Sequence, residues 1–248
     1  MATIYDVAAY AGVSPKTVSR VINGDAPVSD KTRAKVETAI AALGYIPSSA
    51  ARVMRSNRSD LVGLITGAIS RTGEYGGVHG LPDMFLIKGI QQKIREAGKT
   101  LMIADTDNRY EQIDPLVRTF MEHRAEGILY VTESHREIVL PEMPNRCPMV
   151  LVNCFDAAGT PSVLPDDERG QYDLVRNIIR HGHRRIAYIT LQAGAEATRL
   201  RLAGYRRALD ESDMVFDPDL VQTGITDFAN GSEPLIAAVL KLLSLADP

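Results

Sequence analysis

The chain has 248 residues, 45% hydrophobic and 24% charged, with a formal net charge of −3, which is typical of a globular protein and excludes a disordered or fibrous chain. No apolar run reaches the length of about eighteen residues that a transmembrane helix needs, and the N-terminus lacks the basic and apolar regions of a secretory signal. The two cysteines, Cys147 and Cys154, are too few for a disulfide framework, so we expect a cytoplasmic protein.

The charge is unevenly distributed along the chain. Residues 1–60 carry eight Lys and Arg against five Asp and Glu, a balance of +3, and the remainder carries twenty against twenty-six, a balance of −6. The two balances sum to −3. A basic first segment on an acidic remainder indicates an anionic partner for the first segment.

The first twenty-four residues have the start and stop signals of two short helices. Thr3 and Asp6 form a capping box for a helix that ends at Gly12. Ser14 caps a second helix, with Pro15 at its first position. Two short helices joined by a tight glycine-containing turn predict a helix-turn-helix.

A third helix is expected to cover the first two. The second helix ends at Asn23-Gly24, and the third begins at Ser29 and ends at Gly44. Its apolar stripe consists of Val36, Ala39, Ile40 and Leu43. This stripe predicts a small all-α domain with its own core.

The outer face of the second helix is suited to DNA. Lys16 and Arg20 are four residues apart, so they point the same way, and both can donate to guanine O6 and N7. Short polar groups nearby are suited to phosphate oxygens. The residues expected to contact the DNA backbone are Thr3, Tyr5, Ser14, Thr17, Ser19 and Asn23. A helical hairpin with a merely solvated face is the other interpretation.

The stretches TIYDVAAYAGVSPKTVSRVIN and VSDKTRAKVETAIAALGYIPSSAAR closely resemble the DNA-binding head of the lactose-repressor (LacI/GalR) family. The resemblance implies a transcriptional regulator, most often a repressor, that binds a palindromic double-stranded operator as a homodimer. It places the second helix in the major groove and implies that Pro15, Lys16 and Arg20 read bases. Pro15 offers only apolar contact, for example to a thymine methyl group.

The segment that follows, about 48–58, carries Arg52, Arg55 and Arg58 at a spacing of three residues. From the residues alone it is either a flexible basic linker or a short helix that is unstable by itself in water. The resemblance implies a hinge helix that folds on DNA and inserts an apolar wedge into the minor groove, with Ala51 and Met54 at the contact. We therefore expect residues 1–58 to form the DNA-binding domain, hinge included.

From residue 59 onward, short apolar runs alternate with helical periods, which predicts an α/β domain with a parallel sheet covered by helices on both faces. The expected strands are 61–65, 100–104, 127–131, 149–153, 162–164, 185–189 and 220–223. Ligands of such sheets bind at the carboxyl ends of the strands.

The resemblance extends into this domain through DPLVRTFMEHRAEGILYV, PSVLPDDERGQYDLVRNIIRHGHRRIAYIT and RLRLAGYRRAL. It implies a periplasmic-binding-protein-like, two-lobed effector and dimerisation domain with a small carbohydrate-like or nucleoside-like ligand in its cleft. Arg201 matches the arginine of the family's R-L-x-G motif and is expected to contact the effector, as are Asn153 and Gly67. We expect this domain to span residues 59–248. Family members continue beyond the last residue of this chain, so we expect the second lobe of the domain to be incomplete at its C-terminal end.

Other functions have weaker support in the sequence. Gly98-Lys99-Thr100 precedes a strand and lacks the first glycine of a phosphate-binding loop, and His181 and His183 have no ligand partners at metal spacing. No catalytic signature is found, so no enzyme activity, cofactor or metal is expected. A sugar-binding protein without a role in transcription is the main alternative, and an α/β enzyme with an incidental head is another.

Overall fold

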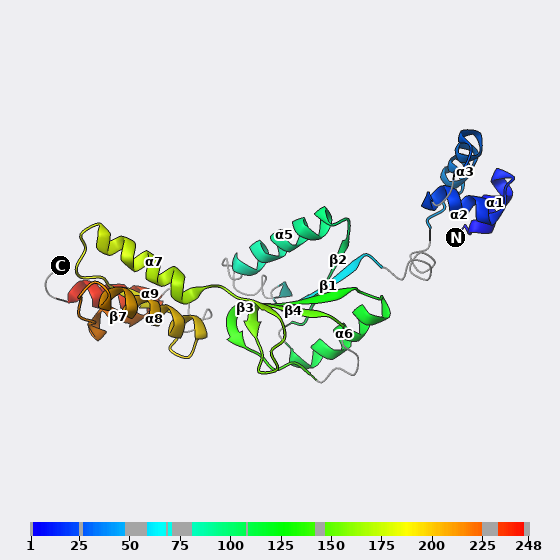
Figure 1. Ribbon diagram of the computed structural model, residues 1–248. Coiled ribbons are helices and arrows are strands. Elements are labelled where there is room, and N and C mark those ends of the chain that lie inside the picture. Colours follow the sequence, from blue (N-terminus) through cyan, green and yellow to red (C-terminus); the bar gives the residue numbers. More distant parts are fainter. Residues whose placement is uncertain are drawn as a thin grey trace. The chain divides into compact units, whose positions relative to one another are not determined.

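In the computed structural model, the residues described are 2–24, 27–47, 59–67, 69–70, 81–107, 109–141, 147–224 and 233–245. The chain divides into two compact units, residues 1–59 and 60–248, which we call the head and the body (Figure 1).

The head contains the three helices that the sequence predicts. They are α1 (Ile4–Ala11), α2 (Pro15–Asn23) and α3 (Asp30–Leu43). The side chains of Thr3, Ser14 and Ser29 each accept a backbone N–H at the start of the helix that follows. Glycines in the left-handed region end all three helices, at φ of 66°, 70° and 57°.

Small apolar residues pack the three helices into one core. Val7, Val18, Val36 and Ala39 are each fully buried, and they come from all three helices. Burial of a valine side chain contributes about 1.5–3 kcal/mol, so this cluster gives the head stabilisation of its own. The predicted mini-core is confirmed.

The body begins with a five-stranded parallel sheet in the order β2-β1-β3-β4-β5. Its strands are β1 (Leu61–Thr66), β2 (Thr100–Asp105), β3 (Gly127–Glu137), β4 (Met149–Phe155) and β5 (Ser162–Val163). Side chains alternate across the sheet, so neighbouring residues of β1 pack on opposite faces. Leu64 packs with Ile87 of α5 (Leu81–Glu96), whereas Ile65 packs with Val117 and Phe120 of α6 (Ile113–Glu122). Figure 1 shows these two helices on opposite faces of the sheet.

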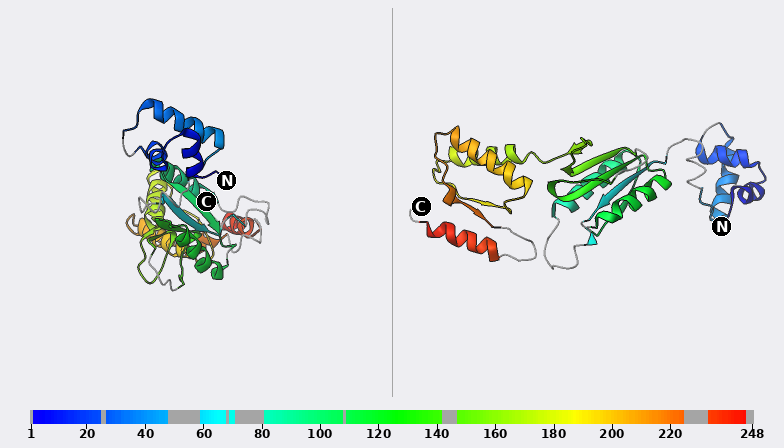
Figure 2. Two further views of the ribbon diagram at one scale, coloured as in Figure 1. Left: turned by 90° about the vertical axis from the view of Figure 1, so that its right-hand side faces the viewer. Right: turned by 90° about the horizontal axis from the view of Figure 1, so that it is seen from below.

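A second, two-stranded parallel sheet follows. Its elements are α7 (Asp167–Arg180), β6 (Tyr188–Thr190), α8 (Glu196–Asp210), β7 (Val221–Thr223) and α9 (Glu233–Ser244), with short 3-10 turns at Tyr110–Gln112 and Pro218–Leu220. In Figure 2, α7 and α8 cover one face of the sheet and α9 covers the other. Tyr205, Val175 and Leu209 fill the core beneath α7 and α8.

The expected strands are all present, with different ends in several cases. β3 runs to Glu137, six residues beyond its expected end, because its register with β4 shifts between Val131 and Arg136 and pairing then resumes. β6 begins at Tyr188 and not at 185, because within the described residues its only ladder is with the three residues of β7. The expected hinge helix, with Ala51 and Met54, lies outside the described residues.

Candidate functional site

The second helix of the head has a buried face and a charged face. Val18 and Val21 point into the core. Lys16 lies two positions before Val18 and Arg20 lies two positions after it, and both are exposed. Pro15 is half-buried at the first position of the helix. The helix therefore presents two cations on one surface while its opposite face is fixed by packing.

Several polar side chains around α2 are paired within the head. The Ser14 and Thr17 hydroxyls are 3.0 Å apart, and Asn23 Nδ2 donates to Ser19 Oγ at 3.1 Å. The Thr3 hydroxyl donates to Asp6 Oδ2 at 2.7 Å, and the Thr3 backbone N–H donates to the same oxygen. These two hydrogen bonds lower the pKa of Asp6.

Tyr5 differs from these residues because its side chain is 71% exposed. Thus the structure places all the predicted backbone-contacting residues on or beside α1 and α2. Thr3 and Ser14 are N-caps, Thr17 is bonded to Ser14, and Ser19 is bonded to Asn23.

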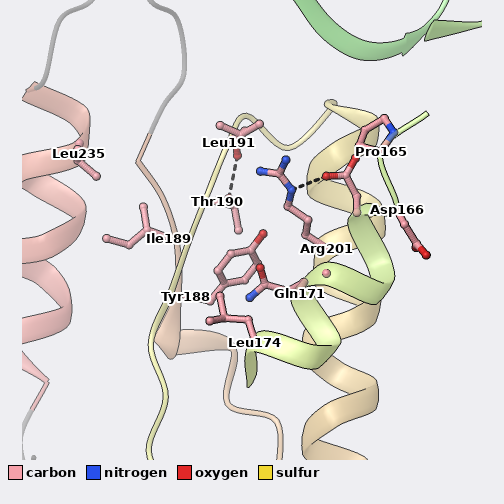
Figure 3. Close-up of a pocket in the computed structure, with 12 residues that line it drawn as sticks. Pro165, Asp166, Gln171, Leu174, Tyr188, Ile189, Thr190, Leu191, Arg201 and Leu235 are labelled. Carbon is pink, nitrogen blue, oxygen red and sulfur yellow. Dashed lines mark hydrogen bonds and ion pairs between the residues drawn. The ribbon is translucent and has the colours of Figure 1, made fainter. Parts of the chain in front are cut away.

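In the body, Arg201 of α8 lies in a cavity of about 500 Å³ between α7, α8 and the β6 edge (Figure 3). The Arg201 Nε–H donates to Asp167 at 2.7 Å, and the terminal nitrogens lie toward Leu191. The cavity is lined by Pro165, Asp166, Asp167, Gly170, Gln171, Leu174, Tyr188, Ile189, Thr190, Leu191, Arg201 and Leu235. Polar groups on one side and apolar side chains on the other are typical of a small-molecule pocket.

Asp167 is a site residue that the sequence did not single out. Its side chain is 3% exposed, and its second oxygen, Oδ2, is 2.8 Å from Nδ1 of His135, which is 5% exposed. His135 belongs to the extended end of β3 and packs edge-on against Phe155. The available signal for Asp167 was the acidic pair Asp166-Asp167 at the start of the helical period that follows the expected strand 162–164, whereas His135 gave none.

Gly204 determines how closely α8 approaches α7. A Cβ atom at this position would overlap the backbone carbonyl of Glu168 in the first turn of α7. The absence of a side chain therefore brings Arg201, one turn earlier, within reach of Asp167.

The other two residues expected to contact an effector lie elsewhere. Gly67 lines a separate cavity of about 590 Å³ at the carboxyl ends of β1 and β3, which also includes Thr106, Arg109 and Thr132. Asn153 lines neither cavity. Its φ is 61°, and its Nδ2 donates to the Thr132 carbonyl oxygen at 3.0 Å. The structure thus does not bring Gly67, Asn153 and Arg201 into one pocket.

The loop near Gly67 is tied to the end of β2. Asp105 accepts from the Ser70 hydroxyl at 2.5 Å and from the backbone N–H groups of Ile69 and Asp107 at 2.8 and 2.7 Å. Burial raises the pKa of Asp105, but these hydrogen bonds together outweigh burial and leave the pKa below its ordinary value.

The part of the chain that the structure describes has neither a metal-binding cluster nor a helix that could cross a membrane. Within it, no group of three or more His, Cys, Asp or Glu side chains is arranged to hold a metal ion. Within the same residues, no helix has the length and apolar character that crossing a membrane requires.

Comparison with known families gives two matches. Residues 3–48 match the model of bacterial regulatory proteins of the lacI family, and residues 84–242 match the periplasmic binding proteins and sugar binding domain of the LacI family. Together they cover the head helices and most of the body.

Individual relatives agree with these matches. The ribose operon repressor of Escherichia coli K12 is 33% identical over 95% of this chain and 69% of its own length. A lac repressor dimer bound to operator and the anti-inducer ONPF has 26% identity and a TM-score of 0.64 over 86% of this chain and 63% of that one. A complex of the transcriptional regulator CelR with cellobiose has 30% identity and a TM-score of 0.53 over 98% of this chain and 70% of that one.

Proposed function

The chain belongs to the LacI family of bacterial regulatory proteins, and from this premise we propose that it binds operator DNA through α2 and represses transcription under the control of a small effector. The observation that carries the proposal is the face of α2 that presents Lys16 and Arg20 to solvent while Val18 and Val21 anchor the opposite face. A helix held in this way can enter the major groove without repacking.

We assign base contacts to three residues of α2, Pro15, Lys16 and Arg20. Arg20 reaches guanine O6 and N7 with two donors, Lys16 reaches similar acceptors, and Pro15 contacts a thymine methyl group. The hydroxyl groups at the helix caps and the Tyr5 side chain contact phosphates. Exposed hydroxyl groups and the free N–H groups at the start of α2 are favourable partners for phosphate oxygens. These contacts set the position and orientation of α2 on the duplex.

The operator is proposed to be a palindrome bound by a homodimer. The structural relative bound to operator is a dimer, and a dimer joins two modest half-site affinities into one strong affinity. Ala51 and Met54 of the 48–58 segment are proposed to contact the minor groove between the half-sites.

The effector is proposed to bind in the body. The relatives include a ribose operon repressor and a regulator in complex with cellobiose, which favours a carbohydrate. Arg201 contributes N–H donors to the cavity between α7 and α8, and Tyr188 and Leu174 contribute apolar surface for the C–H faces of a sugar ring.

Selection of bound duplexes from a random DNA pool tests the proposal. We expect enrichment of a palindrome, and we expect an Arg20→Ala variant to lose about 1–3 kcal/mol of affinity and its preference at one base of each half-site. Lys35→Ala is the matched control, because it removes one exposed cation from α3 and not from α2. Unchanged base preference in Arg20→Ala, or no enriched sequence with the wild-type chain, would contradict the proposal.

A further inference from the structure

We propose that Asp167, held by His135, orients Arg201 and balances its charge, so that the cavity between α7 and α8 accepts an uncharged polyhydroxyl ligand and rejects its phosphorylated form. This inference rests on the proposed function, because it assigns the chemical class of the effector. It assigns positioning roles to two residues outside the family's R-L-x-G motif.

The Asp167 carboxylate is held at both of its oxygens. Both oxygens of Asp167 are engaged, Oδ1 by the Arg201 Nε–H at 2.7 Å and Oδ2 by His135 Nδ1 at 2.8 Å. A carboxylate only accepts hydrogen bonds, so the His135 Nδ1 carries the hydrogen. Because both oxygens are bonded and only 3% of the side chain is exposed, Asp167 is held in one orientation. Its bond to the Arg201 Nε–H then fixes the orientation of the Arg201 guanidinium.

Arg201 presents its terminal nitrogens, and not its Nε, to a ligand in the cavity. Its side chain is 40% exposed, in contrast to that of Asp167, and the Nε–H is directed to the carboxylate. The two terminal nitrogens lie on the side away from this contact, toward Leu191 (Figure 3). A planar guanidinium held at Nε presents its remaining donors as a fork, which suits two neighbouring hydroxyl oxygens.

The lining of the cavity carries a net negative charge. Among the residues that line the cavity, the charged ones are Asp166, Asp167 and Arg201, two carboxylates against one guanidinium. A phosphate in this cavity would gain from a cation that is already paired and would be repelled by both carboxylates. A neutral sugar incurs no such repulsion.

The N-terminus of α7 borders the cavity. Helix N-termini commonly bind phosphate because their N–H groups and dipole favour anions. Here the Asp166 side chain already accepts the Arg169 N–H at 3.2 Å, and Asp167 and Glu168 occupy the first turn. The protein's own carboxylates therefore take the place that an anionic ligand would need.

His135 adds a link between the two sheets of the body. It lies at the end of β3 in the five-stranded sheet, whereas Asp167 and Arg201 belong to the helices that cover the two-stranded sheet. The orientation of Arg201 thus depends on a residue of the first sheet, 66 positions earlier in the chain.

Titration calorimetry of the 248-residue chain tests selectivity, with D-ribose and D-ribose 5-phosphate as the probes. We expect D-ribose to bind at least about tenfold more tightly, and Asp167→Asn, which keeps the side-chain shape, to reduce this ratio by about tenfold. Asp173→Asn removes a carboxylate from the exposed face of the same helix and should leave the ratio unchanged. Tighter binding of the phosphorylated probe to the wild-type chain, or an unchanged ratio in Asp167→Asn, would overturn the proposal.

A second measurement requires no ligand. In the free chain, the NMR resonance of the Arg201 Nε–H, identified by its loss in Arg201→Lys, should exchange slowly with water. His135→Ala should speed this exchange several-fold, and His135→Gln, which restores a donor, should recover part of the protection. The Nε–H of Arg169, paired with exposed Asp173, serves as the internal control.

Unchanged exchange of the Arg201 Nε–H in His135→Ala would refute the positioning roles, even if neither sugar gives measurable heat. Failure of the DNA selection would refute the proposed function, and it leaves this exchange measurement unaffected. A thermal melt of each variant separates loss of positioning from loss of folding.

Discussion

In the head, polar side chains at the start of α2 and along it are paired with residues three or four positions away, whereas Arg201 in the body is paired with a residue 34 positions earlier. The surface of α2 therefore depends on one helix and a small core. The cavity around Arg201 depends on the packing of α7 against α8 and on a histidine at the end of β3. A change deep in the body can thus abolish effector binding while the head keeps its structure.

The largest effect expected from this comparison is that of Gly204→Ala. The added methyl group would overlap the Glu168 carbonyl, so α8 would have to move away from α7 at a cost of about 3 kcal/mol in the stability of the body. Urea unfolding, followed by NMR signals assigned to each unit, should show this loss in the body alone.

Gly89→Ala is the control for that experiment. Gly89 lies within α5, and a Cβ there would meet no atom within 4 Å, so alanine should stabilise this helix by about 0.5–1 kcal/mol. Equal destabilisation of the head and the body by Gly204→Ala would show that the two units are not independent.

The next largest effect should appear in the head with Val18→Ala. Val18 is fully buried at the centre of the three-helix core, and its truncation should cost the head about 2 kcal/mol. Since the cavity around Arg201 makes no use of this core, sugar binding measured by calorimetry should be unchanged while affinity for the selected palindrome falls. A matching loss of sugar affinity would show that the cavity around Arg201 depends on the core of the head.

The same contrast explains which features the sequence could predict. The caps at Thr3, Ser14 and Ser29 and the left-handed glycines are local signals, and the structure confirms them. The strands of the body were also predicted, because buried apolar runs mark them. Register shifts, such as the one that extends β3 to Glu137, depend on the partner strand and leave no local trace.

The pairing of His135 with Asp167 was not predictable in the same way. The two residues are 32 positions apart, and neither has a spacing that indicates a contact. Asn153 illustrates the opposite problem, since a polar residue at the end of a strand has the pattern of a ligand contact. In the structure, its backbone is left-handed and its Nδ2 bonds to the Thr132 carbonyl oxygen, which links β4 to β3 where the register between them shifts. Its contact with an effector stays a prediction.

A smaller effect is expected from Thr3→Ala at the start of α1. The Thr3 hydroxyl accepts the Asp6 N–H at 3.3 Å and donates to the Asp6 carboxylate, so its removal should cost the head about 1 kcal/mol. Thermal unfolding of the head should reveal this loss. Thr38→Ala, in the exposed interior of α3, is the matched control and should be neutral or slightly stabilising, because alanine is the better helix former. Equal effects of the two variants would show that the Thr3 cap contributes nothing specific.

The smallest effect expected is a pH dependence in the body that originates at Asp105. Its pKa in the folded chain lies below the ordinary value of 3.8, so the folded state favours the ionised carboxylate. Its contribution to stability is therefore fully present above pH 3.8 and is lost as the pH falls below that value through the folded pKa. The group is partly exposed, so the contribution should stay below about 1 kcal/mol.

The measurement is an NMR titration of the chemical shift of the Asp105 carboxyl carbon between pH 6 and 2, roughly the range over which an aspartate with a lowered pKa titrates. Its midpoint should fall below 3.8, and the amide resonances of Ile69 and Ser70 should shift with the same midpoint, because their N–H groups donate to this carboxylate. Asp105→Asn should remove that shared transition and leave the Asp6 titration in the head unchanged, since the hydrogen bonds of Asp6 among the described residues are those of its own capping box. A midpoint for Asp105 above 3.8 would mean that burial outweighs the hydrogen bonds, and the loop beside Gly67 would then be held to β2 by other contacts.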